Sequence, residues 1–409
     1  MAWNAKKSNE SPSEQQRPAQ DESSQVLSNP VFFSSQPSLP SLPSLNFRDQ
    51  LAPPSLHQCI TTLKGHSSYI SALAIHEKSL YSGSSDQDIR LWTSIPSDPP
   101  SHQRRTPPSF IVAATKNPVK CLAISGEILF SSHQDHKIRV WQVNHQENPR
   151  YKLRAVLPTP KDRFLSLLLP KNYVQVRRHK KCTWVHHVDA ISALAVSRDG
   201  TLLYSVSWDR TLKVWRTSDF KCMESVAGAH HDAINAITVS WEGYIYTGSA
   251  DTTIKVWRRH AEEKKHSLVA TLERHKSAVN ALALSADGSV LYSGACDRSV
   301  VVWEGGGGLM AATGALRGHT RAILSLAATA ELVCSGSADG TVRVWRRGED
   351  KRYSCLSVLE GHGRPIKSLA MVGVESHIES SSSYLVFSGG MDSDIKVWKL
   401  LVPPLEGTM

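Results

Sequence analysis

Seven copies of one short pattern are spaced along this chain. Each copy has a Ser or Thr, an Asp four residues later, and a Trp six residues after the Asp, with aliphatic residues between Asp and Trp. The copies end at Trp92, Trp141, Trp215, Trp257, Trp303, Trp345 and Trp398. A set of residues that recurs this regularly is an architectural element. The function must therefore lie in the residues that break the repeat.

Each repeat also has the pattern of successive β-strands. Apolar segments such as ISALAI and INAITV are followed by a turn, a second strand, the Asp turn and a third strand that ends in Trp. The first ordered segment, Cys59–His66, precedes the first complete set, and the last repeat stops near Leu400 without an outer strand of its own. The sequence therefore predicts an all-β, seven-bladed β-propeller over residues 59–400, closed by the N-terminal strand.

The two ends of the chain differ in composition from the repeats. Residues 1–58 are rich in Ser, Pro and Gln, which predicts a disordered tail, and residues 401–409 form a short C-terminal tail. No apolar run approaches the roughly 20 residues that a membrane span needs. The seven Cys contain no C-x-x-C pair, which argues against a zinc site and indicates a reducing compartment. We expect a soluble, intracellular, monomeric propeller without cofactor or metal.

The repeated polar residues predict one hydrogen-bonded quartet of His, Ser or Thr, Asp and Trp in each of six blades. The six quartets are His66, Ser82, Asp86 and Trp92; His187, Ser205, Asp209 and Trp215; His230, Thr247, Asp251 and Trp257; His275, Ser293, Asp297 and Trp303; His319, Ser335, Asp339 and Trp345; and His362, Ser388, Asp392 and Trp398. A Ser-His-Asp catalytic triad would occur once, in a cleft, so we interpret the quartets as structural. In repeat two Thr115 replaces the His, and we expect that blade to be less tightly braced.

The longest interval between repeats holds a basic insertion. Successive Trp residues are 74 positions apart after Trp141, against a common spacing of 42. The insertion, about residues 150–183, has ten Lys or Arg and one acid. It therefore supplies most of the net charge of +10 that the whole chain carries. Its outer strand is either Tyr151–Leu157, which we favour, or Lys181–His186, and its FLSLLL segment is expected to dock as a short helix. The patch Arg177, Arg178, Lys180 and Lys181 has the composition of a nuclear-import or polyanion-binding segment, or of an ordinary solvated loop.

Two rims of the propeller carry further departures. The residue after the repeat Trp is Arg or Lys in blades three, four, six and seven, which predicts a cationic crescent on the bottom rim or a row of isolated charges. On the top rim, Trp208 precedes the turn Asp and either packs against the insertion or forms an exposed binding anchor. The other predicted top-rim contact residues are Tyr69, Asp189, Asp232, Lys276, Arg321 and Arg364. Their mixed signs suit a protein partner better than a uniform polyanion.

At this level of detail the chain resembles the plant WD40-repeat proteins of the JINGUBANG-like group. The resemblance covers nearly all of residues 59–400 and rests on stretches such as KDRFLSLLLPKNYVQVRRHKKCTWVHHVDAISALAVS, YSVSWDRTLKVWRTSD and GALRGHTRAILSL. It implies a plant protein of the cytoplasm and nucleus that binds other proteins, with one known member linked to restraint of pollen germination and to a transcription factor. No repeat has the Trp-Asp-x-Arg ending of cullin-ligase substrate receptors.

Three classes of function are compared on these observations. The leading hypothesis is a non-enzymatic scaffold that binds a regulatory protein, such as a transcription factor, at the top face around Trp208. The alternative is a propeller that binds nucleic acid or another polyanion through the basic insertion and the bottom rim, which we consider less favoured. Catalysis is not expected, because no nucleophile, acid or metal set stands outside the repeats.

Overall fold

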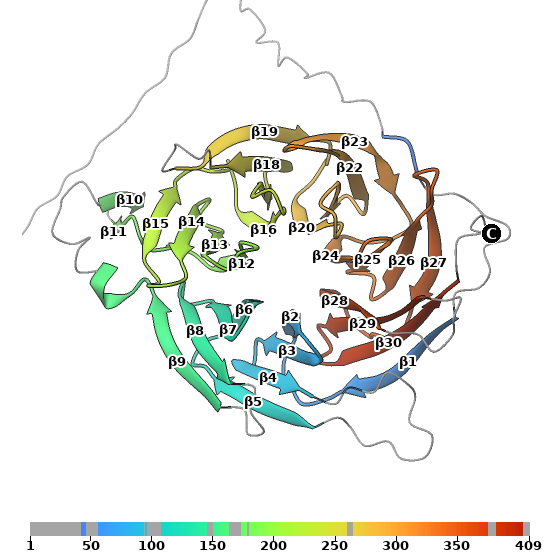
Figure 1. Cartoon of the computed structure of the whole chain (residues 1–409), viewed down its shortest axis with the longest axis horizontal. Coiled ribbons are helices and arrows are strands. Elements are labelled where there is room, and N and C mark those ends of the chain that lie inside the picture. Colours follow the sequence, from blue (N-terminus) through green and yellow to red (C-terminus); the bar gives the residue numbers. More distant parts are fainter. Residues whose placement is uncertain are drawn as a thin grey trace, which may run out of the picture. The chain divides into compact units, whose positions relative to one another are not determined.

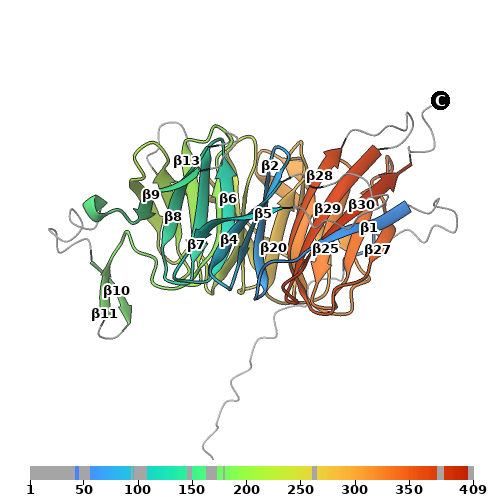
Figure 2. The ribbon, with the colours of Figure 1, turned by 90° about the horizontal axis from the view of Figure 1, so that it is seen from below.

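The computed structural model describes residues 42–45, 56–93, 95, 108–144, 150–162, 173–177, 180–259, 265–374 and 382–403. In this part of the chain seven four-stranded antiparallel sheets stand around a central axis as the blades of a β-propeller (Figure 1). Seen from the side, the strands run between two faces of the ring (Figure 2). We call the face that carries the turns between second and third strands the top face, and the opposite face the bottom face. The predicted all-β, seven-bladed fold is confirmed.

Blades one to three follow each other along the chain. Blade one has β2 (Ile70–His76), β3 (Ser79–Ser84), β4 (Asp88–Trp92) and β5 (Ser109–Ala114). Blade two has β6 (Val119–Ser125), β7 (Ile128–His133), β8 (Ile138–Asn144) and β9 (Arg150–Leu157). Blade three has β12 (Ile191–Val196), β13 (Leu202–Ser207), β14 (Leu212–Arg216) and β15 (Cys222–Val226).

Blades four to six repeat the same order. Blade four has β16 (Ile234–Val239), β17 (Ile245–Ser249), β18 (Thr253–Arg258) and β19 (Ser267–Glu273). Blade five has β20 (Val279–Leu284), β21 (Val290–Ala295), β22 (Val300–Gly306) and β23 (Leu309–Leu316). Blade six has β24 (Ile323–Ala328), β25 (Leu332–Ser337), β26 (Val342–Arg347) and β27 (Tyr353–Leu359).

Blade seven is built from both ends of the propeller. Its first three strands are β28 (Ile366–Val374), β29 (Ser382–Gly390) and β30 (Ile395–Val402), and its outer strand is β1 (Leu56–Leu63). β1 pairs antiparallel with β30, from Leu56 opposite Leu401 to Leu63 opposite Ile395. The predicted closure by the N-terminal strand is therefore confirmed, and the pairing leaves β30 without an open edge.

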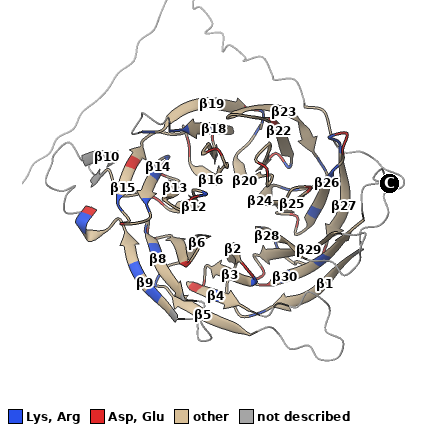
Figure 3. Ribbon diagram, in the orientation of Figure 1, with Lys and Arg blue, Asp and Glu red and all other residues tan. Residues whose placement is uncertain are grey.

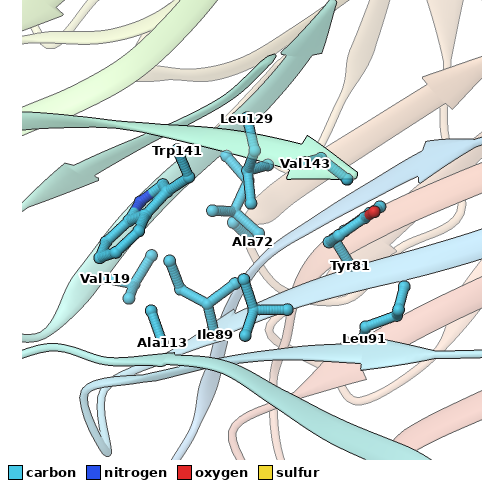
Figure 4. Close-up of a cluster of buried hydrophobic side chains, with 11 residues drawn as sticks. Ala72, Tyr81, Ile89, Leu91, Ala113, Val119, Leu129, Trp141 and Val143 are labelled. Carbon is cyan, nitrogen blue, oxygen red and sulfur yellow. The ribbon is translucent and has the colours of Figure 1, made fainter. Parts of the chain in front are cut away.

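The hydrophobic core is divided among the interfaces between neighbouring blades. Seven buried clusters can be traced in the described residues, and each takes its side chains from two adjacent blades. Between blades one and two, Ile89 and Leu91 pack with Val119, Leu129 and Trp141 (Figure 4). The indole of each repeat thus reaches the core that its blade shares with the preceding blade. The buried strands read as apolar on most positions because both faces of each blade are covered.

The basic insertion follows the earlier of the two candidate outer strands. β9 pairs with β8 along blade two, and Leu157 stands opposite Ile138, at the end of β8 that follows the Asp turn. The chain therefore leaves blade two on the top face. The later candidate contributes instead to β11 (Lys180–Thr183), which pairs only with β10 (Tyr173–Arg177) in a separate hairpin. The FLSLLL segment, predicted to form a docked helix, lies outside the described residues.

Part of the predicted N-terminal tail belongs to the folded structure. Ser44 forms a parallel bridge with Ala315 at the edge of β23, and the Tyr353 amide donates to the Leu45 carbonyl over 3.2 Å. Leu45 also lies against Gly314, which leaves room for its side chain. This differs from the prediction of a tail up to residue 58, because Leu42 and Leu45 bury apolar side chains on blades four to six.

Candidate functional site

The polar quartet of blade one is a closed hydrogen-bond network. The Trp92 indole donates to the Ser82 hydroxyl over 2.8 Å, and that hydroxyl donates to His66 Nε2 over 2.8 Å. His66 Nδ1 donates to the Asp86 carboxylate, also over 2.8 Å, which assigns the tautomer of the ring. The same carboxylate accepts the Ser67 amide and so fixes the entry to the next strand. The polar side-chain groups of the quartet are thus hydrogen-bonded to one another or to the backbone.

The same network occurs in the five other regular blades. The distance from His Nδ1 to the Asp carboxylate is between 2.8 and 3.1 Å in all six. The indole nitrogen lies 2.8 to 3.0 Å from the Ser or Thr hydroxyl. The six His side chains are at most 1% exposed, so no substrate can reach them. This burial argues against a nucleophile–base pair, which needs access to its substrate.

Burial and hydrogen bonding hold these groups in fixed charge states. Burial lowers the pKa of His66, His187 and His319, although the neighbouring Asp opposes the shift. Burial would raise the pKa of Asp339, but hydrogen bonds from Thr341 and His319 outweigh it and lower that pKa to about 2. The pKa of the matching Asp is lowered as well at Asp86, Asp209, Asp251 and Asp297. In the quartets of His66, His187 and His319, a neutral imidazole beside an ionised carboxylate is therefore the stable state at neutral pH.

Blade two builds its network with a histidine that the sequence analysis did not consider. His133 lies at the end of β7, fully buried, and its Nε2 accepts the Ser131 hydroxyl over 2.8 Å. The Trp141 indole donates to Ser131 over 2.8 Å, as in the regular blades. His133 Nδ1 donates to the Asn117 carbonyl over 3.2 Å instead of to an Asp. Blade two was expected to be less tightly braced because it lacks the upstream His. The imidazole of His133 takes the place of that ring.

The turn Asp of blade two is satisfied elsewhere. Asp135 accepts two hydrogen bonds from the Arg139 guanidinium, at 3.2 and 2.8 Å. The His133 ring has no hydrogen bond to a carboxylate. Burial and the charge of Arg139 lower its pKa to about 4, and the weaker effects of the Asn117 carbonyl and the Asp135 charge oppose this shift. The signal in the sequence was a His two residues after the repeat Ser, in the one repeat that lacks the upstream His.

The top mouth of the central channel is asymmetric. The innermost strand of each blade lines the channel (Figure 1), and the residue just before it is Ala or Pro in six blades but Tyr69 in blade one. The second residue of that strand is Lys in blades two and seven, Lys120 and Lys367. Blade three adds Trp208, which is 47% exposed. In blades four and six the positions matching Tyr69 and Trp208 are all Ala.

These large side chains interact with one another. The Lys120 ammonium lies 5.8 Å from the centre of the Trp208 ring. Burial opposes ionisation of Tyr69, but a hydrogen bond with Ser85 and the charges of Lys120 and Lys367 lower its pKa. Lys367 is open to solvent at the mouth yet crowded by the channel wall, and this burial together with the charge of Lys120 lowers its pKa. The mouth therefore has one cationic, aromatic side and one side of small residues.

The remaining predicted top-rim residues are exposed and are spread over five blades, so they form no single cluster. They are Asp189, Asp232, Lys276, Arg321 and Arg364. The Asp189 and Asp232 carboxylates each accept the amide of the following residue over 2.7 Å. Of the predicted set, only Tyr69 and Trp208 belong to the cationic, aromatic side.

The basic patch of the insertion is placed only in part. Arg177, Lys180 and Lys181 lie on the β10–β11 hairpin, whose backbone is described but whose side chains are not, and Arg178 lies outside the described residues. Basic residues of the same insertion also lie on the outer strand β9 (Figure 3), where Lys152 and Arg154 are exposed.

The predicted crescent on the bottom rim is interrupted by ion pairs. Arg216 of blade three pairs with Asp219 at 2.7 Å. In blade six Arg346 pairs with Glu331 at 3.2 Å, and Arg347 pairs with Glu304 of blade five at 2.7 Å. The crescent is therefore not a continuous band of free positive charge. Glu331 and Glu304 lie 15 and 43 residues from their arginines, so the sequence did not identify them as partners.

Two further classes of site are absent from the residues that the structure describes. No helix in them is long and apolar enough to cross a membrane. They contain no group of three or more His, Cys, Asp or Glu side chains arranged to hold a metal ion.

Comparison with known proteins gives a family match over more than half of the chain. The family model described as "WD domain, G-beta repeat" matches residues 57–93, 179–216, 221–258, 266–304, 311–346 and 353–399. Blade two, with its displaced histidine, lies between the first two matched segments. The chain is similar in fold to the WD40 β-propeller domain of Doa1, with a TM-score of 0.60 and 18% identity over 84% of this chain and 96% of that one.

Two curated relatives match parts of the chain. Jouberin of Mus musculus is 31% identical over 123 residues, which are 29% of this chain and 12% of Jouberin. A ribosome biogenesis protein WDR12 homolog of Chlamydomonas reinhardtii is 27% identical over 227 residues, which are 53% of this chain and 45% of that protein. The chain thus spans less than half the length of either relative.

Proposed function

Because the chain belongs to the WD40 repeat family, we propose that it is a non-enzymatic scaffold that binds a regulatory protein at the Trp208 side of the channel mouth. WD40 propellers generally act as platforms for protein contacts. The observation that carries the proposal is the asymmetry of the mouth. The repeat is broken there by Tyr69, Lys120, Trp208 and Lys367 on one side, and small residues leave space on the other.

Each of these side chains suits a protein contact. A half-exposed Trp offers a large apolar face that loses little conformational entropy on binding, and such residues dominate binding energy at interfaces. Lys120 and Lys367 would meet an acidic or carbonyl group of the partner, since the structure records no salt bridge for either within its described part. The partner segment would then lie across the alanines of blades four and six.

We propose further that the partner is a transcription factor in plant development, as in the restraint of pollen germination. This part of the proposal rests on the resemblance to the JINGUBANG-like group. The name of the Chlamydomonas relative refers to ribosome biogenesis, so assembly factors of ribosomes are the competing class of partner. The identity of the captured protein decides between the two.

The test is affinity capture with wild type, Trp208→Ala and Phe110→Ala. Phe110 is the matched control, because it is an aromatic residue that is 48% exposed and lies on the outer strand β5. We expect one prey protein to bind wild type and Phe110→Ala and to be lost with Trp208→Ala, and the purified prey to bind directly with the same ranking. Equal recovery with all three forms would overturn the top-face assignment.

The proposal includes residence in both cytoplasm and nucleus, with the patch from Arg177 to Lys181 acting in import. Clusters of basic residues of this length are typical of import segments. Replacing the five residues with Ala and Ser in a fluorescently tagged protein should lower the nuclear fraction. Unchanged partitioning would end the import part of the proposal and leave the scaffold part intact.

A polyanion-binding function has less support. The ion pairs of Arg216, Arg346 and Arg347 remove much of the free positive charge that a long nucleic-acid track would need. The salt dependence of partner binding separates this alternative from the scaffold function.

A further inference from the structure

A cavity of about 760 Å³ opens on the bottom face between blades three and four. It is lined by the turn after β12, by the turn after β16, and by Arg258, Arg259 and His266 near the end of β18 and the start of β19. Three arginines line it: Arg198, Arg258 and Arg259. The cavity is separate from the channel mouth, because it lies at the opposite ends of the strands.

The arginines of blade four differ from their counterparts in blade six. Arg258 and Arg259 follow Trp257 as Arg346 and Arg347 follow Trp345. Both blade-six arginines form salt bridges with glutamates. Within the part of the chain that the structure describes, neither Arg258 nor Arg259 has a carboxylate in ion-pair range, and the same holds for Arg198. The two arginines of blade six are thus neutralised by glutamates, whereas the equivalent two of blade four have no ion-pair partner within the described residues.

Aromatic rings hold two of the three guanidinium groups in place. The Arg198 guanidinium carbon lies 3.0 Å from the centre of the Trp241 ring, and that of Arg258 lies 4.4 Å from the centre of the Tyr244 ring. Arg258 also donates to the Tyr244 hydroxyl. Stacking of this kind fixes the plane of a guanidinium and leaves its edge free to donate hydrogen bonds. Less conformational entropy is then lost when an anion binds.

Two of the acids around the cavity are committed to other partners. Asp199 accepts the Ser197 hydroxyl at 2.6 Å and the Thr201 hydroxyl at 2.7 Å, so it serves to fix the turn. Glu224 accepts His266 Nδ1 at 2.6 Å in a buried pair beneath the cavity. Glu242 is exposed on the rim and has no salt bridge within the residues that the structure describes. Three arginines and two carboxylates, Asp199 and Glu242, line the cavity, so its lining keeps a net positive charge.

We propose that this cavity binds the phosphate group of a phosphorylated serine or threonine in a partner protein. A phosphomonoester carries about −1.5 to −2 charges and three acceptor oxygens, which suits three arginines better than a single carboxylate does. Nucleic acid is a poorer fit, because it needs a long cationic track, and the neighbouring Arg216 is already paired with Asp219. One face of the Trp241 ring is covered by Arg198, so that face is not free to stack a base.

The test uses immobilised degenerate peptides with a fixed central phosphoserine or phosphothreonine, and matched libraries with unmodified Ser/Thr or Glu at that position. The full-length chain is applied as wild type, Arg198→Gln, Arg259→Gln and Arg216→Gln. Arg216→Gln is the matched control, because it removes the same charge from an exposed position on the same rim. Melting temperatures confirm that each variant is folded. Trp208→Ala is included to keep this site distinct from the channel mouth.

We expect phosphorylated libraries to retain wild type, with binding reduced roughly tenfold or more by Arg198→Gln and by Arg259→Gln. Arg216→Gln and Trp208→Ala should bind as wild type does. The proposal is overturned if unmodified peptides bind equally, if no phosphorylated library binds, or if Arg216→Gln has the same effect. Equal competition by an unrelated single-stranded oligonucleotide would assign the cavity to nucleic acid instead. This test does not depend on the affinity capture with Trp208→Ala. If that capture finds no partner at the channel mouth, the peptide-binding results still decide whether the cavity binds phosphate.

Discussion

Blade two and blade seven depart from the repeat in opposite ways. Blade two takes all four strands from one continuous segment but replaces the upstream histidine with His133 from its second strand. Blade seven keeps the regular quartet around His362 but takes its outer strand, β1, from the far end of the propeller. Strand continuity and the polar quartet are therefore separate requirements, and a blade can satisfy either by a substitute. Such substitution is expected of a structural device and not of a catalytic one.

The position of His133 explains how the substitute reaches the same place. In the other blades that position, two residues after the repeat Ser or Thr, is Ser, Ala or Gly. In blade seven it is Gly390, and a side chain there would collide with His362 and Asp392. A side chain from this position thus occupies the space that the upstream histidine fills in a regular blade. Either source, but not both, can supply the ring.

The largest expected effect comes from breaking the continuity of blade seven. Deleting β1 (Leu56–Leu63) removes the buried Ile60 and Leu63 from the cluster between blades seven and one and exposes the edge of β30. We expect the melting temperature to fall by roughly 10 °C or more, since each buried aliphatic side chain contributes about 1.5–3 kcal/mol. Deleting residues 1–41 should change it by less than about 2 °C. Equal losses for the two truncations would refute the closure.

The next effect separates the two histidine sources. His362→Ala removes the ring that bonds the Asp392 carboxylate. We expect this change to lower the free energy of unfolding by about 3 kcal/mol or more. His133→Ala leaves only neutral groups unpaired, because Asp135 is bound by Arg139, and should cost about 1–3 kcal/mol. Urea unfolding of the two variants measures the difference. A larger loss for His133→Ala would contradict the assigned partners.

Acid should weaken blade two before it affects the aspartates. His133 is neutral when folded because its pKa is lowered from 6.5 to about 4, whereas the unfolded chain takes up the proton near pH 6.5. Its contribution is therefore complete above pH 6.5 and is lost as the pH falls towards 4, to a total on the order of 3 kcal/mol. The stability difference between wild type and His133→Asn should narrow over that range in urea titrations. A constant difference would show that His133 does not titrate this way.

The smallest effect is expected from restoring the regular pattern in blade two. Thr115→His with His133→Ser recreates the upstream ring and the serine found at that register in most other blades. Thr115→His alone should be destabilised by crowding, and His133→Ser alone by loss of the ring. The double variant should lie within about 1 kcal/mol of wild type, so the two changes are strongly coupled. Additive losses in the double-mutant cycle would mean that the two positions do not share one space.

The sequence alone predicted the parts of the fold that local patterns encode. Strand alternation, the repeat spacing and the missing outer strand near Leu400 were enough for the ring and its closure. It missed what depends on contacts across space. The partners of Arg346 and Arg347 lie 15 and 43 residues away, and the docking of Leu45 on Gly314 joins distant segments. Their pairing is set by the packing of blades, which no single strand pattern records.

The candidate site shows the same division. The sequence singled out Trp208 and Tyr69 as top-rim residues, but it did not single out Lys120 or Lys367. Only the ring brings blades seven, one, two and three together at one mouth. It also left open whether Trp208 packs against the insertion. In the structure nearly half of its surface stays exposed.

The most direct test of the account is the dissociation constant of the captured partner for wild type and Trp208→Ala, measured at 50 and 200 mM salt. An anchored contact at the channel mouth predicts that Trp208→Ala weakens binding roughly tenfold or more, and that the added salt changes the wild-type value by less than about threefold. The account would be contradicted if Trp208→Ala left the dissociation constant unchanged and the added salt weakened wild-type binding about a hundredfold or more. That result would indicate polyanion-type binding.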